Sequence, residues 1–175
     1  MSRSKYHEDF RVGEYILYTD GGNTNNRRGY CGAVLTDPHG TILDARGRHL
    51  GSNVTNNIAE YNGVLLGLEL APESALRIVL RSDSQLIVRQ ITYLYACTAP
   101  TLRGLRDKVH ELTRKKFDGR VDFEWIRRGR NSADKICKQL NRGATEAEAA
   151  QFVKNFQHVH EYAGPQVATH KDEVQ

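Results

Sequence analysis

The chain has 175 residues, of which 39 % are hydrophobic and 26 % charged, and its formal net charge is +4. This length suits one domain with a tail, and this composition excludes fibrous, collagenous and wholly disordered proteins. The longest apolar runs, such as 64–66 and 78–80, are far shorter than the roughly 20 residues that cross a membrane. Because the first residues contain no apolar signal segment, we expect a cytoplasmic protein without a membrane partner.

The first 50 residues predict three strands joined by tight turns. Residues 14–20 are rich in β-branched and aromatic types, and Gly21-Gly22-Asn23 is expected to end this strand in a turn. A second strand is expected over 30–36. Asp37-Pro38-His39-Gly40 has the residue types of a turn, so 41–50 returns as a third strand. The three strands form an antiparallel meander.

The rest of the chain alternates helices with strands. From Asn57 to Pro72, apolar residues recur at spacings of three and four, which predicts a helix of about four turns. After it we expect a strand over 76–82, helices over 84–95 and 101–117, a strand over 121–127 and a helix over 132–144. A strand reached through a helix usually runs parallel to its neighbour. The pattern therefore predicts an α/β (α+β layered) fold, with a five-stranded mixed sheet flanked by helices.

The two ends of the chain are assigned separately. Residues 1–13 are a polar lead-in, and 14–144 form the globular domain. Apolar positions over 145–163 predict one more helix, which either docks on the sheet or mediates self-association. The polar stretch 164–175 is expected to be a disordered tail.

Basic residues concentrate in one part of the chain. Residues 1–100 carry ten Lys and Arg against ten Asp and Glu, 101–142 carry thirteen against six, and 143–175 carry two against five. A solvated surface explains many such clusters, and a face that binds a polyanion explains others. Nucleic acid is therefore a candidate partner.

The three cysteines indicate neither a disulfide framework nor a zinc site. Cys31, Cys97 and Cys137 are odd in number, widely spaced and form no C-x-x-C pair. We expect them to be buried, reduced thiols.

Four acidic residues stand at the ends of otherwise apolar elements, namely Asp20, Glu60, Asp83 and Asp134. Each has a purely structural alternative. The patterns Asn57-x-x-Glu60 and Asn131-x-x-Asp134 resemble helix capping boxes, Asp83 fits an N-cap, and Asp20 fits a turn stabiliser.

Topology favours a metal site over these alternatives. If the fourth strand lies beside the first, Asp20 and Asp83 leave the ends of neighbouring parallel strands about 5 Å apart. Their repulsion calls for a hard divalent cation, and Mg²⁺ prefers carboxylates, waters and phosphate oxygens. Two such ions about 4 Å apart suit phosphodiester hydrolysis.

Four short motifs occur in order along the chain. They are Tyr18-Thr19-Asp20-Gly21-Gly22, Thr55-Asn56-Asn57-Ile58-Ala59-Glu60-Tyr61, Arg81-Ser82-Asp83-Ser84-Gln85, and Trp125 followed by Asn131-Ser132-Ala133-Asp134. Together with the intervening elements, they resemble the type 1 ribonucleases H over residues 14–144. The resemblance implies a ribonuclease H-like catalytic domain with strand order 3-2-1-4-5.

The resemblance also implies an activity and a site. The activity is endonucleolytic hydrolysis of the RNA strand of RNA–DNA hybrids, leaving 5′-phosphate and 3′-hydroxyl ends. Two Mg²⁺ or Mn²⁺ ions would be held by Asp20, Glu60, Asp83 and Asp134. The partner would be an RNA–DNA hybrid, and we expect a monomer.

Two groups of residues would bind the hybrid by the same resemblance. The RNA strand and its 2′-hydroxyls would be approached by Gly21, Gly22, Asn23 and Gln85. The minor-groove side would be approached by Thr55, Asn56 and Asn57, with Thr55 near a DNA phosphate. Recognition of the 2′-hydroxyl is what separates RNA from DNA. Helix capping is the alternative for Asn56 and Asn57.

The last motif departs from the family pattern. One residue separates Asn131 from Ala133-Asp134, where the family has two, and this puts the register of Asp134 in question. Residues 125–134 contain no counterpart of the His that some members carry there, so the arginines Arg127, Arg128 and Arg130 are candidates for a phosphate contact. Trp125 is expected to pack in the core or on the sheet, with a platform for base stacking as the alternative.

Two other functions remain open at this point. One is a catalytically inactive module that binds hybrid or RNA, and the other is a different nuclease of the ribonuclease H-like superfamily. Occupation of all four acidic positions argues against the first. The Asn56-Asn57 pair and the Gly21-Gly22-Asn23 segment favour RNA discrimination over the second.

Overall fold

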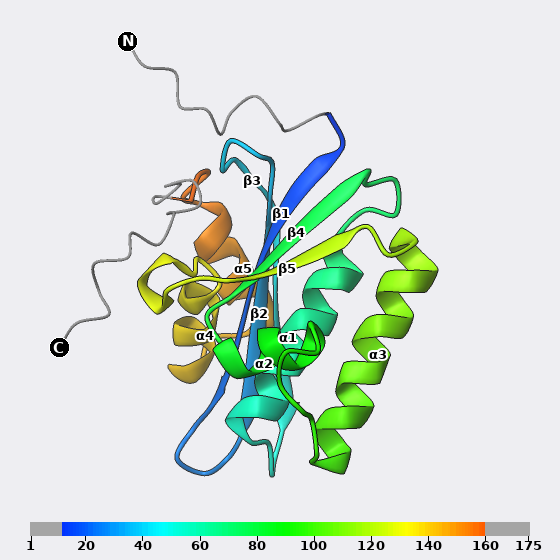
Figure 1. Ribbon diagram of the computed structural model, residues 1–175. Helices are drawn as coiled ribbons and strands as arrows, with labels where there is room; N and C mark the ends of the chain where they lie inside the picture. The colour runs from blue at the N-terminus through cyan, green and yellow to red at the C-terminus, as the bar shows by residue number, and fades with distance from the viewer. Residues whose placement is uncertain (1–11, 160–175) are drawn as a thin grey trace, which may run out of the picture.

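The computed structural model describes residues 12–159. Its centre is a five-stranded sheet with strand order β3-β2-β1-β4-β5 (Figure 1). The strands are β1 (Glu14–Asn23), β2 (Gly29–Thr36), β3 (Ile42–Gly51), β4 (Arg77–Ser82) and β5 (Val121–Trp125). The first three strands are antiparallel, whereas β4 runs parallel to β1 and β5 parallel to β4. The expected mixed sheet and its strand order are confirmed.

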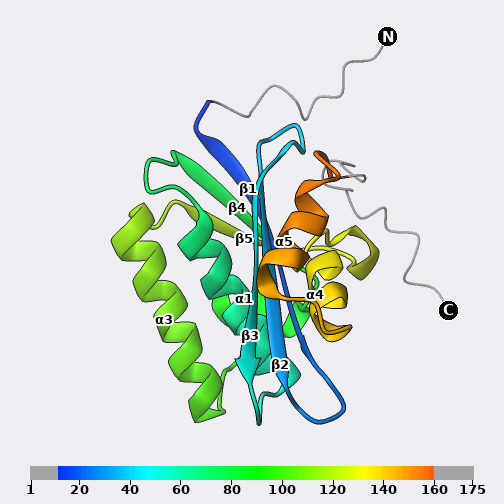
Figure 2. The same ribbon diagram turned by 180° about the vertical axis from the view of Figure 1, so that it is seen from behind.

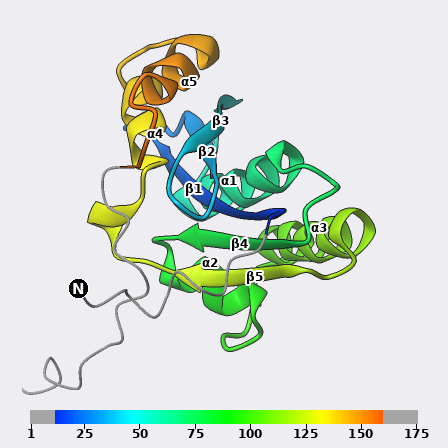
Figure 3. The same cartoon turned by 90° about the horizontal axis from the view of Figure 1, so that it is seen from above.

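Helices cover both faces of this sheet. They are α1 (Asn56–Leu70), α2 (Gln85–Ile91), α3 (Pro100–Phe117), α4 (Asp134–Asn141) and α5 (Glu146–Lys154), with a short 3₁₀ helix, η1, over Arg128–Arg130. Figures 2 and 3 show α1 and α3 on one side of the sheet and α4 and α5 on the other. The described helices include none that is long and apolar enough to cross a membrane.

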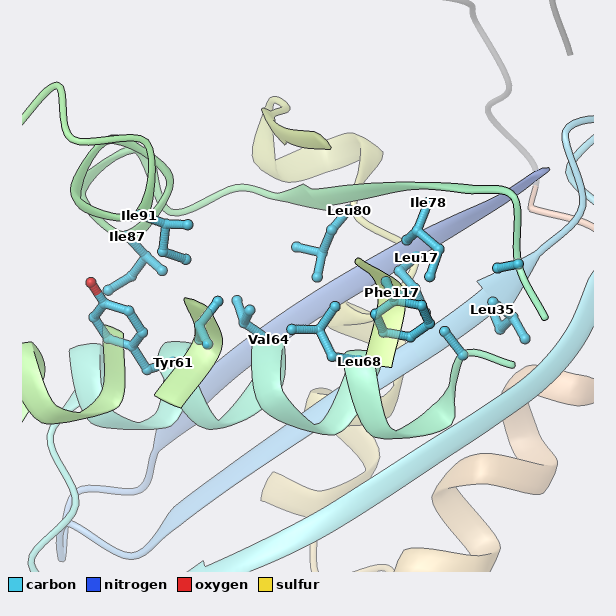
Figure 4. Close-up of a cluster of buried hydrophobic side chains, with 13 residues drawn as sticks. Leu17, Leu35, Tyr61, Val64, Leu68, Ile78, Leu80, Ile87, Ile91 and Phe117 are labelled. Atoms are coloured by element: carbon cyan, nitrogen blue, oxygen red, sulfur yellow. The ribbon is translucent and has the colours of Figure 1, made fainter. Parts of the chain in front are cut away.

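The larger core lies between the sheet and α1, α2 and α3 (Figure 4). Alternation along the strands sends Leu17 and Leu80 to this face, where they meet Tyr61, Val64 and Phe117 from the helices. All five side chains are fully or almost fully buried. Because β1 is central and covered on both faces, its residues from Ile16 to Asp20 are all buried.

The second core lies on the opposite face, under α4 and α5. Ile16 and Tyr18 of β1 pack there with Ile136 of α4 and with Ala149 and Val153 of α5. The helix expected after residue 144 therefore docks on the sheet, as one of the two alternatives from the sequence proposed.

The first strand is longer than predicted. Gly21, Gly22 and Asn23 do not form a turn, because they continue β1 and pair with Cys31, Tyr30 and Gly29 of β2. Asp20 therefore lies inside a strand rather than at its end.

Several other elements are shorter than predicted, among them α4, which spans Asp134–Asn141 instead of 132–144. The chain leaves α2 at Thr92, and Tyr93 then adopts a left-handed φ of 62°, so this helix does not reach Tyr95. Strand β5 ends at Trp125 instead of Arg127, and η1 follows it at Arg128–Arg130. Helix α5 ends at Lys154 instead of residue 163.

The predicted tail over 164–175 and most of the lead-in over 1–13 lie outside the described residues. The prediction for the cysteines is confirmed, since Cys31, Cys97 and Cys137 are free and buried.

Candidate active site

Three of the four predicted carboxylates converge. Asp20 of β1, Glu60 of α1 and Asp83, which follows β4, each offer an oxygen, and these oxygens lie within 4.8 Å of one another. Parallel pairing explains the meeting of the two aspartates, because Thr19 stands beside Ser82 in the ladder and each strand carries its aspartate one residue later. The expected proximity of Asp20 and Asp83 is confirmed.

Two glycines bring Glu60 to this pair from the other layer. A Cβ at Gly63 would lie 2.5 Å from the carbonyl oxygen of Asp20, and a Cβ at Gly21 would run into the main chain of Ala59. Helix α1 thus packs with its backbone directly on β1. Larger residues at either position would push the first turns of α1, and with them Glu60, away from the strand.

The cluster carries more negative charge than the protein neutralises. The pKa of Asp20 is raised to about 7, first by burial and then by the charges of Asp83 and Asp134. The pKa of Glu60 is raised to about 9 by burial and by Asp20 and Asp83. Within the described chain, Oε2 of Glu60 is buried without a hydrogen-bond partner. Such a set of hard oxygen donors fits a divalent cation.

Asp83 is held by neighbours on two sides. Burial raises its pKa, while a hydrogen bond from Asn131 and the charge of Arg128 oppose that rise. The Asn131 side chain is only 4 % exposed and also donates from Nδ2 to the carbonyl oxygen of Thr19 at 2.9 Å. This one amide therefore links the residue before Asp20 to Asp83. The sequence identified Asn131 as part of a motif but did not predict this role.

Asp134 stands apart from the other three acids. It is the first residue of α4 and forms an ion pair with Lys138, one turn later, at 2.7 Å. The group of carboxylates that meet within 4.8 Å, among the residues described, does not include it. It is near enough to raise the pKa of Asp20. This placement at the rim agrees with the unusual spacing of the last motif.

The capping alternatives for the acids are wrong. The N-cap of α1 is Thr55, whose Oγ1 accepts from the amide of Ile58 at 3.2 Å. The N-cap of α2 is Ser84 rather than Asp83. Helix α4 begins after Ala133 with no side-chain capping bond.

The residues expected to bind the hybrid border this cluster. Gly21, Gly22 and Asn23 form the end of β1, and the Asn23 amide donates to the carbonyl oxygen of Val54 at 2.8 Å, which ties β1 to the segment before α1. Asn56 is exposed and Asn57 half-buried in the first turn of α1, and Gln85 is exposed at the start of α2. Their contacts with nucleic acid stay predictions.

Trp125 does not pack as predicted. It is 47 % exposed at the end of the edge strand β5, and its indole Nε1 donates to the carbonyl oxygen of Asp83 at 3.1 Å. The expectation of core or sheet packing is wrong because the ring stands where the sheet ends. In the sequence, only its place before the motif Asn131-Ser132-Ala133-Asp134 indicated that Trp125 lies near the site.

The sequence also gave no sign of a buried arginine on β4. Arg81 is 7 % exposed, and it donates to Glu124 at 3.1 Å and to the Tyr18 hydroxyl at 3.3 Å. A strand that otherwise reads as apolar gives no reason to expect a buried arginine two residues before Asp83.

The chain resembles known proteins in its family profile, its sequence and its structure. The profile of a family described as reverse transcriptase-like matches residues 18–140. The bifunctional protein Rv2228c of Mycobacterium tuberculosis is 32 % identical over 139 residues, which cover 77 % of this chain and 37 % of that protein. The ribonuclease HI of Halobacterium salinarum is 36 % identical over 104 residues, which cover 58 % of this chain and 52 % of that protein.

Among solved structures, LC11-RNase H1 in complex with an RNA/DNA hybrid has a TM-score of 0.64 and 31 % identity, covering 69 % of this chain and 91 % of that one. The chain spans about half or less of the length of the two sequence relatives. The matched region contains the whole sheet except the start of β1, together with the clustered carboxylates. The chain therefore belongs to the reverse transcriptase-like family and, within it, to the type 1 ribonucleases H that its motifs resemble.

Proposed function

We propose that this protein is an endonuclease that hydrolyses the RNA strand of RNA–DNA hybrids with two divalent ions, Mg²⁺ or Mn²⁺. The observation that carries the proposal is the meeting of Asp20, Glu60 and Asp83 within 4.8 Å. Burial raises the pKa of all three carboxyl groups, and the charges of neighbouring carboxylates add to the rise at Asp20 and Glu60. The relationship to a ribonuclease H that binds a hybrid supports the choice of substrate.

Asp20, Glu60 and Asp83 are the residues that would hold the metal. Bound divalent ions supply Lewis-acid chemistry, which activates water for attack on a phosphodiester and stabilises the leaving oxygen. The chain supplies the position of the ligands. Asn131 fixes Asp83 relative to β1, and the close contact of α1 with β1 fixes Glu60.

Two charged groups at the rim have supporting roles in this proposal. Asp134 adds negative charge beside Asp20 without joining the group of three. Arg128 is exposed in η1, and its charge opposes the rise in the pKa of both Asp83 and Glu60, so its charge acts at the site. We assign Arg128 to a contact with the substrate phosphate. In this proposal, Arg128 stands beside the site where some relatives have a His.

Selection of a hybrid follows from the groups around the carboxylates. Gly21, Gly22, Asn23 and Gln85 would contact the RNA strand, and Thr55, Asn56 and Asn57 would lie on the minor-groove side. The exposed amides of Asn56 and Gln85 open α1 and α2 and present donors and acceptors to solvent. Groups of this kind distinguish a 2′-hydroxyl from the hydrogen of DNA.

The test is a cleavage time course on an end-labelled RNA–DNA hybrid with Mg²⁺ or Mn²⁺. Duplex DNA and single-stranded RNA of the same sequence are the substrate controls, and EDTA and Asp83→Asn are the site controls. Internal cuts that are confined to the RNA strand of the hybrid and absent in both site controls are expected. Tight binding of the hybrid without cleavage by either metal would instead support an inactive binding module, and cleavage of duplex DNA would support another nuclease of the superfamily.

A further inference from the structure

We propose that Trp125 is a positioning residue for the metal site, whose indole N–H fixes the peptide that carries Asp83. This inference rests on the proposed function, because it assigns Asp83 to metal binding. It adds a residue that the four acidic positions do not include. The role follows from where β5 ends relative to β4.

The indole continues the pairing of β4 with β5 by one residue. The ladder ends at the pair Ser82 and Trp125, and the amide of Ile126 donates to the carbonyl oxygen of Ser82 at 2.9 Å. Beyond Ile126 the chain turns away into η1. The next carbonyl after the end of β4, that of Asp83, accepts from Nε1 of Trp125 at 3.1 Å. A side chain thus makes the contact that the departing strand no longer makes.

Asp83 needs this support because it lies between two elements and belongs to neither. Strand β4 ends at Ser82 and α2 begins at Gln85, so the backbone at Asp83 has neither strand nor helix pairing of its own. Ser82 Oγ accepts from the amide of Ser84 at 3.1 Å, and Asn131 holds the carboxylate. The hydrogen bond from Trp125 restrains the carbonyl oxygen of Asp83 itself.

Packing alone gives no reason for a tryptophan at this position. The side chain is 47 % exposed at a sheet edge, whereas the cores on both faces are filled by other residues.

The expected consequence of losing the bond from Trp125 is a change in how the Asp83 carboxylate is held for the metal. Carboxylates that repel one another must be held together before a cation arrives, and outer groups that orient a ligand typically change metal affinity by a measurable factor.

The experiment uses the fact that Trp125 is the only tryptophan of the chain. Trp125→Phe keeps an aromatic ring and removes the N–H. Biosynthetic replacement of tryptophan by its sulfur isostere, in which S stands for the N–H, alters the same single site with almost no change of shape. Mn²⁺ binding to the hybrid-free protein is measured by calorimetry for each form. A matched control is Tyr95→Phe, which removes the exposed bond from Arg89 to the Tyr95 hydroxyl elsewhere on the surface.

Both altered forms are expected to bind Mn²⁺ about three- to tenfold more weakly than the wild type, the range that one lost hydrogen bond produces. Hybrid affinity in EDTA should change by less than about twofold, and Tyr95→Phe should bind Mn²⁺ as the wild type does. In the metal-free wild type, the single indole N–H signal in NMR should exchange slowly with solvent despite the exposure of the ring.

Unchanged Mn²⁺ affinity in the sulfur-substituted protein would overturn the inference, even if Trp125→Phe failed to fold. A loss confined to hybrid affinity would also overturn it, because Trp125 would then be a substrate contact. Failure of the wild type itself to bind Mn²⁺ would refute the proposed function first, whereas a wild type that binds and cleaves normally isolates the role of Trp125.

Discussion

Gly63 of α1 lies directly against the main chain of Asp20: a Cβ placed on Gly63 would come within 2.5 Å of the Asp20 carbonyl oxygen. This contact joins the helix that carries Glu60 to the strand that carries Asp20. The distance between Glu60 and Asp20 therefore depends on this close contact between the backbones of α1 and β1.

We predict that Gly63→Ala lowers the free energy of unfolding by about 1–3 kcal/mol, the usual range for overpacking a close contact, and reduces cleavage. The neighbour is backbone and cannot rotate away. Gly104→Ala in α3 is the matched control, since a Cβ there meets nothing within 4 Å. It should raise stability by about 0.5–1 kcal/mol, as alanine does in helices. Urea unfolding of both variants measures the difference, and equal stability of the two would contradict the close packing.

Stability of the metal-free protein should fall as pH rises. The pKa of Asp20 is raised from 3.8 to about 7 and that of Glu60 from 4.5 to about 9. Between the ordinary and the raised values, the folded state binds more protons than the unfolded state, so the free energy of unfolding decreases with pH. The decrease should run from about pH 4 to about pH 9 and be smaller in Asp20→Asn. Unfolding in EDTA across this range measures it, and a wild type that gains stability over the window would refute the assignment.

Mg²⁺ should reverse that loss. A ligand that binds only the folded state, at tenfold its dissociation constant, adds about 1.4 kcal/mol to stability. At pH 8, we expect Mg²⁺ to raise the melting temperature of the wild type and to have little effect on Asp20→Asn. Asp122→Asn is the control, because Asp122 pairs with Arg77 on the surface at 2.9 Å, away from the three carboxylates. It should respond to Mg²⁺ as the wild type does, and an equal response in Asp20→Asn would place the ion elsewhere.

Replacing Asp134 should be milder than replacing a clustered acid. Asp134 is ion-paired with Lys138 and lies outside the group of three. Asp134→Asn is expected to reduce cleavage of a hybrid about 10–100-fold, as changes of outer partners do at metal sites, whereas Asp83→Asn should abolish it. Initial rates at saturating Mg²⁺ compare the two. Complete loss in Asp134→Asn would show that Asp134 acts as a ligand in the ordinary register.

On α5, truncating a small buried side chain should cost more stability than truncating a large exposed one. Val153 is 1 % exposed against the sheet, whereas the larger Phe152 is 40 % exposed. Val153→Ala should lower the free energy of unfolding by about 2 kcal/mol, from lost burial and a cavity, and Phe152→Ala by less. Thermal unfolding of the two variants measures the two losses of stability. A greater loss in Phe152→Ala would place the stabilising face of α5 elsewhere.

The sequence by itself determined the five strands of the sheet and pointed to the acidic residues of the site. Alternating and continuous apolar runs marked each of the five strands, and the Pro and Gly residues marked several of their limits, because local backbone preferences and burial act over a few residues. The four motifs then pointed to Asp20, Glu60, Asp83 and Asp134 as one site, and the structure brings the first three together.

The tertiary structure decided what depends on contacts between distant segments. Gly21 and Gly22 read as a turn but extend β1, since β2 offers them partners. Trp125 reads as a packed residue but reaches the carbonyl oxygen of Asp83, because β5 ends beside it. Asp134, whose register the sequence put in question, lies near enough to raise the pKa of Asp20 but outside the group of three carboxylates. In each case, the outcome depends on which group of another element stands opposite, and that is set by the packing of the whole chain rather than by any local pattern.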